Sequence, residues 1–393
     1  MLIKEKVTQA KTLLEEFNID CWIIFTRESA LNGDPILPYF LPGDVTWQTA
    51  ILLFKSGRDV VIIGEYDKKS VEDTGAYNEI IGYVQSIKDD LQKVLKEEKP
   101  GSIAVNFSED SEICDGITHG LFLKLQKYLE EIGMKDAIIS AETLTSALRE
   151  RKSPIEIELI KNAIKETEKI YSEVRDFIRP GITEKEIASF MKKKAHDRGF
   201  GFAWDERICP SVFTGPETAE AHYGPTDRKV ERGHILNMDF GLKINGYCSD
   251  LQRTFYILNE GETEIPEDVR KGFDTIVTVI EECKNAMKPG VKGVEIDQIA
   301  RKILKDNGYE EFPHALGHGV GRFAHDGTAL LGPAWEKYGK RPFKKLEPGA
   351  VFTIEPRLKV EGKGTVTIEE MVVVTENGAD WLSHPQKKIW LIS

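Results

Sequence analysis

The sequence Asn237-Met-Asp-Phe-Gly-Leu-Lys-Ile-Asn-Gly-Tyr-Cys-Ser-Asp250 decides how the rest of the chain is arranged. It predicts a β-hairpin, because two apolar alternating runs flank Asn245-Gly246, the dipeptide best suited to a type I′ turn. With a two-residue turn there, Asp239 lies opposite Gln252 on the partner strand. Asp239 and Asp250 then lie diagonally on one face, about 7 Å apart. A turn one residue longer or shorter would place them on opposite faces.

The surroundings of this carboxylate pair separate two interpretations. Two acids on a strand are ordinarily solvated at the surface. Asp239 instead stands within an apolar run, residues 236–242, which does not suit an exposed strand. A carboxylate among apolar neighbours needs an ion pair, hydrogen bonds or a metal ion. The metal interpretation therefore requires further ligands elsewhere in the chain.

The composition limits the class of protein. The chain has 393 residues and a formal net charge of −12, with no basic tract that would bind nucleic acid. The first residues predict an amphipathic helix rather than a signal peptide, and no apolar run is long enough to cross a bilayer. The five cysteines are scattered and odd in number, which predicts reduced thiols. We expect a cytoplasmic protein that binds neither nucleic acid nor membrane.

The order of helical and strand patterns predicts two domains. Residues 1–150 alternate short apolar runs with amphipathic helices, which is typical of an α/β domain with its own sheet. Ser153-Pro154, followed by acidic residues, predicts the start of a long helix. This helix would open the second domain, residues 151–393.

The second domain contains an internal repeat with an offset of 109 residues. In each copy a Pro-Gly turn, Pro180-Gly181 or Pro289-Gly290, precedes an amphipathic helix that ends at Gly199 or Gly308. Repetition of so long a unit predicts a duplicated domain rather than a solenoid. A cleft between two such halves is a natural place for a functional site.

The second half should carry a hairpin equivalent to the first. Two apolar runs, 351–356 and 365–374, place Glu355 and Glu369 symmetrically about Gly362. An odd-length turn puts both glutamates on one face. Exposed strand acids are the alternative, but the neighbouring residues are too apolar for that.

A glycine-rich segment supplies a further ligand. His314 and His318 have the i, i+4 spacing of a helical zinc pair, but the glycines around them disfavour a helix. One histidine with four carboxylates is an oxygen-rich donor set that suits two adjacent divalent ions. Mn²⁺ or Co²⁺ is expected, with Zn²⁺ or Fe²⁺ as alternatives. Without metal, repulsion and desolvation would make such a cluster costly.

These stretches resemble the pita-bread metallopeptidases, which include methionine aminopeptidase, Xaa-Pro aminopeptidase (aminopeptidase P), Xaa-Pro dipeptidase (prolidase) and creatinase. The matching motifs are Met-Asp-Phe-Gly, Ser-Asp-Leu-Gln-Arg-Thr-Phe, Gly-His-Gly-Val-Gly, Phe-Thr-Ile-Glu-Pro and Thr-Ile-Glu-Glu-Met. The preceding domain and the gap of 14 between Glu355 and Glu369 are typical of the prolidase and aminopeptidase P branch. The resemblance implies an α+β fold, with a duplicated pita-bread catalytic domain after a smaller N-terminal α/β domain of creatinase/prolidase type. It also implies a homodimer.

The resemblance assigns a role to each proposed metal ligand. Asp239 would bind one ion, His318 and Glu355 would bind the other, and Asp250 and Glu369 would bridge both. A hydroxide between the two ions would attack the peptide carbonyl. Glu355 would carry the proton to the leaving nitrogen.

Three further histidines match pocket positions of the family. His222 and His325 would hydrogen-bond the substrate or the developing oxyanion. His314 would be an additional pocket histidine. The alternative for each is an ordinary core or loop histidine.

The expected function is hydrolysis of Xaa-Pro bonds in dipeptides or at the N-terminus of short peptides. Thr367 stands where proline-selective relatives usually carry Arg, Asp326 stands where they carry Glu, and residues 327–345 form a longer segment. These departures bear on proline specificity more than on metal-dependent hydrolysis. The alternatives are a non-proline-specific or small-molecule C–N hydrolase on the same fold, and a catalytically silent peptide-binding relative.

Overall fold

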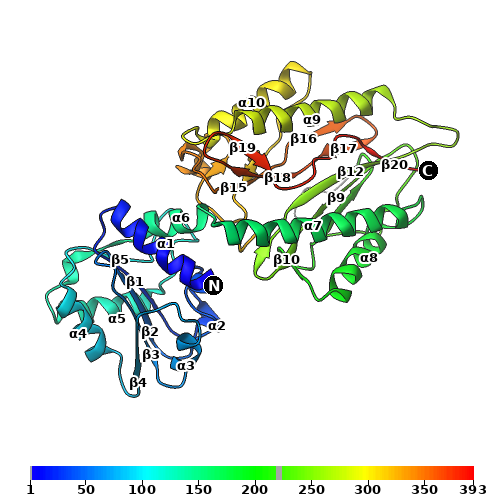
Figure 1. Cartoon of the computed structure of the whole chain (residues 1–393). Coiled ribbons are helices and arrows are strands. Elements are labelled where there is room, and N and C mark those ends of the chain that lie inside the picture. Colours follow the sequence, from blue (N-terminus) through cyan, green and yellow to red (C-terminus); the bar gives the residue numbers. More distant parts are fainter. Residues whose placement is uncertain (1, 218–223) are drawn as a thin grey trace. The chain divides into compact units, whose positions relative to one another are not determined.

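The computed structural model describes residues 2–217 and 224–393. The chain divides into two compact units, Met1–Arg149 and Glu150–Ser393, each with its own sheets (Figure 1). Within the described residues, no helix is both long enough and apolar enough to cross a bilayer.

The first unit is built on a six-stranded sheet with strand order β4-β3-β2-β1-β5-β6. Strands β1, β2 and β3 pair antiparallel, whereas β4, β5 and β6 pair parallel with their neighbours. Apolar side chains of α1 and α6 pack on one face of this sheet, and those of α4 and α5 pack on the other. The elements are α1 Leu2–Glu16, β1 Cys21–Thr26, α2 Ser29–Asn32, η1 Leu37–Tyr39, β2 Thr49–Phe54, β3 Asp59–Gly64, α3 Lys68–Glu72, β4 Glu79–Tyr83, α4 Lys88–Glu98, β5 Ile103–Val105, α5 His119–Glu130, η2 Lys135–Ala137, β6 Ile138–Ser140 and α6 Glu142–Glu150.

The second unit consists of two halves with the same succession of helices and hairpin. Helix α7 packs against β10 and β11 of the first hairpin, and α8 packs against α7 and β8 (Figure 1). Helix α9 packs against β16 and β17 of the second hairpin, and α10 packs against α9 and β14. The first half contains α7 Pro154–Phe177, α8 Glu184–Asp197, β7 Gly201–Phe202, β8 Ser211–Thr214, β9 Ile235–Phe240, β10 Leu242–Ile244, β11 Tyr247–Cys248 and β12 Leu251–Ile257. The second contains α9 Glu267–Ala286, α10 Gly293–Asp306, β13 Gly317–His318, β14 Leu330–Leu331, η3 Glu336–Tyr338, η4 Arg341–Phe343, β15 Val351–Ile354, β16 Arg357–Val360, β17 Gly364–Thr367, β18 Glu370–Val374, β19 Ala379–Trp381 and β20 Trp390–Ile392.

The predicted helix starts and stops of the repeat are confirmed. Backbone N–H groups of Thr183 and Lys292 donate to the carboxylates of Glu186 and Glu295, each at 2.8 Å, before α8 and α10. Both helices are followed by a glycine with positive φ, 70° at one copy and 86° at the other. These local interactions define the same helix twice.

The register of the first hairpin is also as predicted. Asn245 and Gly246 both have positive φ, and Asp239 pairs with Gln252. The two strands are not continuous, because the ladder is interrupted at Gly241 on one strand and just before β12 on the other. A Cβ at Gly241 would lie 2.2 Å from the Ser249 carbonyl oxygen, and the Ser249 hydroxyl accepts a hydrogen bond from the Leu242 N–H. The hairpin therefore bends at this point.

The second hairpin has the predicted odd-length turn, with Val360 paired to Gly364 and Ile354 paired to Glu370. Its ladder is interrupted as well, between β15 and β16 and between β17 and β18. Pro356 contributes to this break because proline has no N–H to donate. Glu355 and Glu369 lie at these interruptions, as Asp250 does in the first hairpin.

Candidate metal centre

The two hairpins meet along a short seam. Gln252 and Glu369 form an isolated antiparallel bridge that joins them. The hydroxyl of Tyr171, on the buried face of α7, lies 2.9 and 2.8 Å from the carbonyl oxygens of Met238 and Leu251. Helix α7 therefore fixes the backbone on both sides of the first hairpin at the level of its aspartates.

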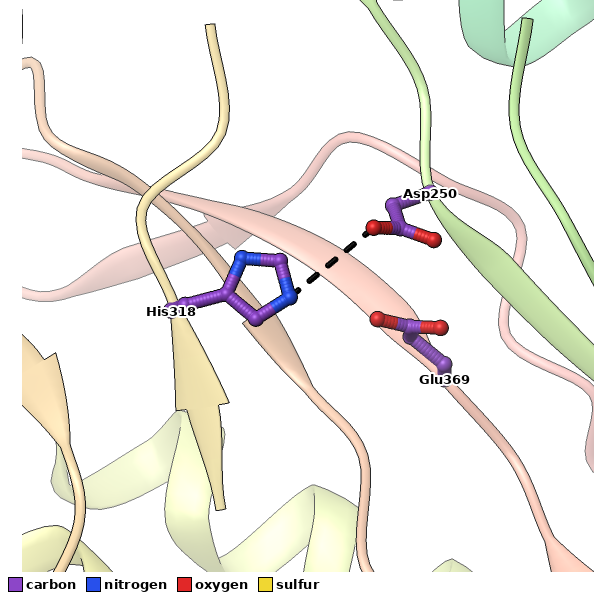
Figure 2. A group of neighbouring side chains, drawn as sticks. All are labelled: Asp250, His318 and Glu369. Atoms are coloured by element: carbon purple, nitrogen blue, oxygen red, sulfur yellow. Dashed lines mark ion pairs between the residues drawn. The ribbon is translucent and has the colours of Figure 1, made fainter. Parts of the chain in front are cut away.

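Three of the predicted ligands converge closely. One ligand atom each of Asp250, His318 and Glu369 lies within 4.8 Å of the others. Figure 2 shows the imidazole of His318, on β13, pointing towards the carboxylates that precede β12 and β18. The His318 Nε2 atom is 3.8 Å from Asp250 Oδ2 and 3.4 Å from Glu355 Oε1. Asp239 lines the same cavity and its charge raises the pKa of Asp250, so all five predicted ligands lie around one cavity.

The backbone of the second half holds His318 in place. The His318 N–H donates to Thr353 Oγ1 at 3.1 Å, and the Glu355 N–H donates to Leu316 O at 2.8 Å. A Cβ at Gly317 would lie 2.0 Å from Thr353 O, so only glycine permits this close approach. His318 Nδ1 is 3.3 Å from Gly319 O. A proton on Nδ1 leaves the Nε2 lone pair facing the carboxylates, as a metal ligand requires.

The carboxylates of this cluster carry strongly unfavourable charge. Burial raises the pKa of Asp239 to about 7. Burial raises the pKa of Asp250 and of Glu369 well above the ordinary value, and the neighbouring carboxylates add to the effect. The pKa of Glu355 is raised by burial and by Asp239. Burial, together with His325, lowers the pKa of His318. The His318 imidazole is therefore neutral and does not offset the negative charge of the carboxylates.

The donor set fits divalent cations. Among the described residues, the buried Oδ1 atom of Asp239 has no hydrogen-bond partner. Oxygen-rich sites with one imidazole suit first-row divalent ions. Cations at this position would remove the repulsion between the carboxylates and would complete the coordination of that oxygen.

The cluster opens into a cavity of about 550 Å³. His314 and His325 both line it, and the rings of His318 and His325 are 4.2 Å apart in an edge-to-face arrangement. His314 is tilted against Phe312 at 4.9 Å. His222 lies in 218–223, outside the described residues, so its position stays a prediction.

Sequence reasoning missed several residues of the cavity wall. Gln252 stands two residues after Asp250, and Arg357 stands two residues after Glu355. The period-two rule for strand faces could have placed both beside the acids. Arg357, on β16, pairs directly with Thr367, on β17. The cavity wall therefore has an arginine on the strand opposite position 367. Other lining residues are Trp204, Asp205, Ile208, Ser211, Phe213, Pro313, Ala315, Ala324, Leu330, Tyr338, Arg341 and Thr365.

A further buried acid, Glu370, follows Glu369 in the sequence and has its own counterion within the chain. Glu370 is fully buried and is not among the residues that line the cavity. Its carboxylate pairs with Arg253 at 3.0 Å and accepts hydrogen bonds from Ser383 Oγ and the Gln386 N–H. This acid therefore has its own counterion, whereas the cluster acids are crowded together.

Comparison with known proteins agrees with this geometry. The sequence profile of metallopeptidase family M24 matches residues 158–376. An Xaa-Pro dipeptidase of Pyrococcus furiosus is 31% identical over 247 residues, covering 62% of this chain and 65% of that protein. An uncharacterized peptidase of Staphylococcus aureus is 26% identical over 345 residues, covering 86% and 88%.

Solved structures extend the likeness to the whole chain. The X-Pro aminopeptidase of Thermotoga maritima superposes with a TM-score of 0.76 at 26% identity, covering 98% of this chain and all of that one. The Xaa-Pro dipeptidase of Bacillus anthracis, at 24% identity and a TM-score of 0.74, shows the shared fold. Together with the matched profile over more than half of its length, these likenesses show that this chain belongs to metallopeptidase family M24 and is a peptidase with the pita-bread fold.

Proposed function

We propose that this peptidase hydrolyses Xaa-Pro bonds in dipeptides or at the N-terminus of short peptides, using two divalent ions. The observation that carries the proposal is the convergence of four buried or half-buried carboxylates and one imidazole from both halves of the duplicated unit. The residues proposed to hold the ions are Asp239, Asp250, His318, Glu355 and Glu369.

Bound ions would supply Lewis acidity, which lowers the pKa of a nucleophilic water and polarises the scissile carbonyl. Glu355 lies at the edge of the cluster and in the cavity wall, where it can accept the proton of that water and pass it to the leaving nitrogen. His325 is placed beside His318 and can donate a hydrogen bond to the developing oxyanion. We retain His222 as a substrate contact and His314 as a pocket residue in this proposal.

The cavity supports a small substrate with one apolar end and one charged end. Trp204, Phe213 and Tyr338 provide apolar surface against which a proline ring could pack. Among the described lining residues, Arg341 and Arg357 carry the guanidinium groups. A carboxylate of a short peptide is the natural partner for such a group. The names of the relatives, Xaa-Pro dipeptidase and X-Pro aminopeptidase, agree with this substrate class.

The proposal is tested with protein stripped by a chelator and then loaded with Mn²⁺ or Co²⁺. We expect two ions per chain and metal-dependent cleavage of Xaa-Pro dipeptides, with slower cleavage of Xaa-Ala dipeptides. Asp250→Asn and Glu369→Gln should abolish both metal uptake and turnover. Glu361→Gln, in the exposed turn of the second hairpin, makes the same charge change away from the cavity and should alter neither. Full activity of either ligand variant would exclude the assignment.

A second candidate is a peptidase or other C–N hydrolase that does not require proline. It is favoured by Thr367, which stands on β17 where proline-selective relatives usually carry an arginine. Arg357, on the paired strand, supplies the positive charge beside this position. Loaded enzyme that binds two ions but cleaves no Xaa-Pro substrate would favour this candidate. Loaded enzyme that cleaves nothing but still binds short peptides would favour a silent relative.

We further propose that residues 1–150 form a creatinase/prolidase-type domain and that the protein acts as a cytoplasmic homodimer. The resemblance to prolidases supports both points. Light scattering of the purified full chain tests the dimer, and a monomer at micromolar concentration would exclude it.

A further inference from the structure

Gln252 occupies a special position in the seam between the hairpins. It pairs with Asp239 on β9 and forms the backbone bridge with Glu369. Its side chain is buried, lines the cavity, and donates from Nε2 to Glu369 Oε2 at 3.0 Å. The side chain that lies opposite an acid of each hairpin at this point is therefore an uncharged amide, which can donate to a carboxylate without adding charge.

Thr367 fixes which way this amide points. Its hydroxyl donates to Gln252 Oε1 at 3.0 Å. The reversed amide would place Oε1 against Glu369 Oε2, so that two acceptors would face each other. The backbone of Thr367 is itself held, because Asn237 Nδ2 and Thr254 Oγ1 both donate to its carbonyl oxygen. These two hydrogen bonds hold the backbone that carries the Thr367 hydroxyl.

This arrangement holds Glu369 Oε2 at the amide of Gln252, while the carboxylate lies within 4.8 Å of ligand atoms of Asp250 and His318. A carboxylate offers about four lone-pair sites, so the amide contact does not prevent coordination. The amide contact does restrict rotation of the Glu369 carboxylate. Burial raises the pKa of Glu369, and the hydrogen bond from Gln252 lowers it in part. Groups that orient metal ligands in this way contribute strongly to metal affinity.

We propose that Gln252 and Thr367 are a pair of positioning residues that hold Glu369 ready to bind metal. The inference rests on the proposed function, because it assumes that Glu369 is a metal ligand. It gives Thr367 a definite role, in which its hydroxyl orients the amide of Gln252.

The test measures Mn²⁺ affinity of chelator-stripped full-length protein by competition with a metal indicator, with thermal unfolding in chelator as the measure of folding. Gln252→Leu should weaken Mn²⁺ binding about tenfold to a hundredfold. Thr367→Val keeps the shape of the side chain but lacks the hydroxyl, and should weaken binding by a smaller factor. Thr367→Ser restores the hydroxyl and should restore most of the affinity.

Gln92 provides a matched control in the first unit. It is a buried glutamine whose Nε2 donates to Glu131 Oε2 at 2.9 Å. Gln92→Leu removes the same kind of contact and should leave Mn²⁺ affinity unchanged.

The outcomes separate the two levels of the proposal. Folded Gln252→Leu protein with wild-type Mn²⁺ affinity overturns the positioning role while the metal centre stands. Equal affinities of the Val and Ser variants overturn the part played by the Thr367 hydroxyl. Wild-type protein that takes up no Mn²⁺ overturns the proposed function and this inference together. The expected order of affinities, wild type and Thr367→Ser above Thr367→Val and Gln252→Leu, supports the inference.

Discussion

Gln252 and Glu369 exchange backbone hydrogen bonds across the seam of the two hairpins, with N···O distances of 3.4 and 3.2 Å. Glu369 lies at the interruption of the second hairpin, and Gln252 lies next to that of the first, at the start of β12. At such interruptions a side chain can turn out of the regular pleat and a strand can bend. Three of the proposed carboxylate ligands, Asp250, Glu355 and Glu369, lie at these positions. The cluster therefore depends on backbone features as well as on acidic side chains.

The bend at Gly241 gives a first prediction. Gly241→Ala places a methyl group 2.2 Å from Ser249 O and 2.7 Å from Trp204 Cζ3, so the hairpin must shift. We expect a loss of about 1–3 kcal/mol in the free energy of unfolding. Metal affinity should also fall, because Asp239 and Asp250 flank the bend. Chemical denaturation and Mn²⁺ titration measure the two effects. Gly378→Ala, which has open space around its Cβ, should change neither.

The pH dependence of stability distinguishes metal-free from metal-loaded protein. The pKa of Asp239 is raised to about 7 by burial, so the folded metal-free protein binds a proton that the unfolded chain releases near its ordinary pKa of 3.8. Stability should therefore fall as pH rises from about 4 through 7, by up to about 1.4 kcal/mol per pH unit for each such group.

Thermal unfolding in chelator between pH 5 and 8 checks this prediction. With metal bound, protons compete with the ions, so the trend should reverse. Asp239→Asn should flatten the slope of the metal-free protein. A melting temperature of stripped wild-type protein that rises with pH over this range would contradict the electrostatic account.

The Arg253–Glu370 pair predicts a purely structural effect. Both side chains are buried, and Glu370→Gln would leave the Arg253 guanidinium with only the more distant Glu168 carboxylate, at 4.0 Å, as a counterion. Removing one partner of such a pair costs about 3–5 kcal/mol. Denaturant unfolding should show this loss, whereas Glu376→Gln, at an exposed site, should not. Two ions per chain should still bind to folded Glu370→Gln protein, because Glu370 is not among the residues that line the cavity.

Arg357 gives a prediction about substrate recognition. If its guanidinium binds the carboxylate of a dipeptide, Arg357→Met should raise KM for Xaa-Pro dipeptides roughly tenfold or more, as expected for a charge-assisted hydrogen bond. The corresponding Xaa-Pro amides, which lack that charge, should be affected little. Lys359→Met removes a charge from an exposed position on the same strand and serves as the control. Equal changes for acid and amide substrates would exclude a carboxylate contact.

Much of this protein followed from short stretches of sequence. The Asn-Gly turn set the register of the first hairpin, since a two-residue type I′ turn permits only one pairing. Symmetry about Gly362 did the same for the second hairpin. The repeated Pro-Gly turns and C-terminal glycines defined the paired helices α8 and α10. These features are local, so their consequences can be worked out before the tertiary structure is known.

Other features depended on contacts between distant segments. No local rule indicates that Gln252 bridges to Glu369 or that Gly241 breaks a strand. The first results from one hairpin packing against the other, and the second from the close contacts of Gly241 with Ser249 and Trp204. The sequence alone determined which acids share a face within each hairpin, because side chains alternate along a strand. Only the tertiary structure decided how the two faces meet, because that depends on packing between the halves.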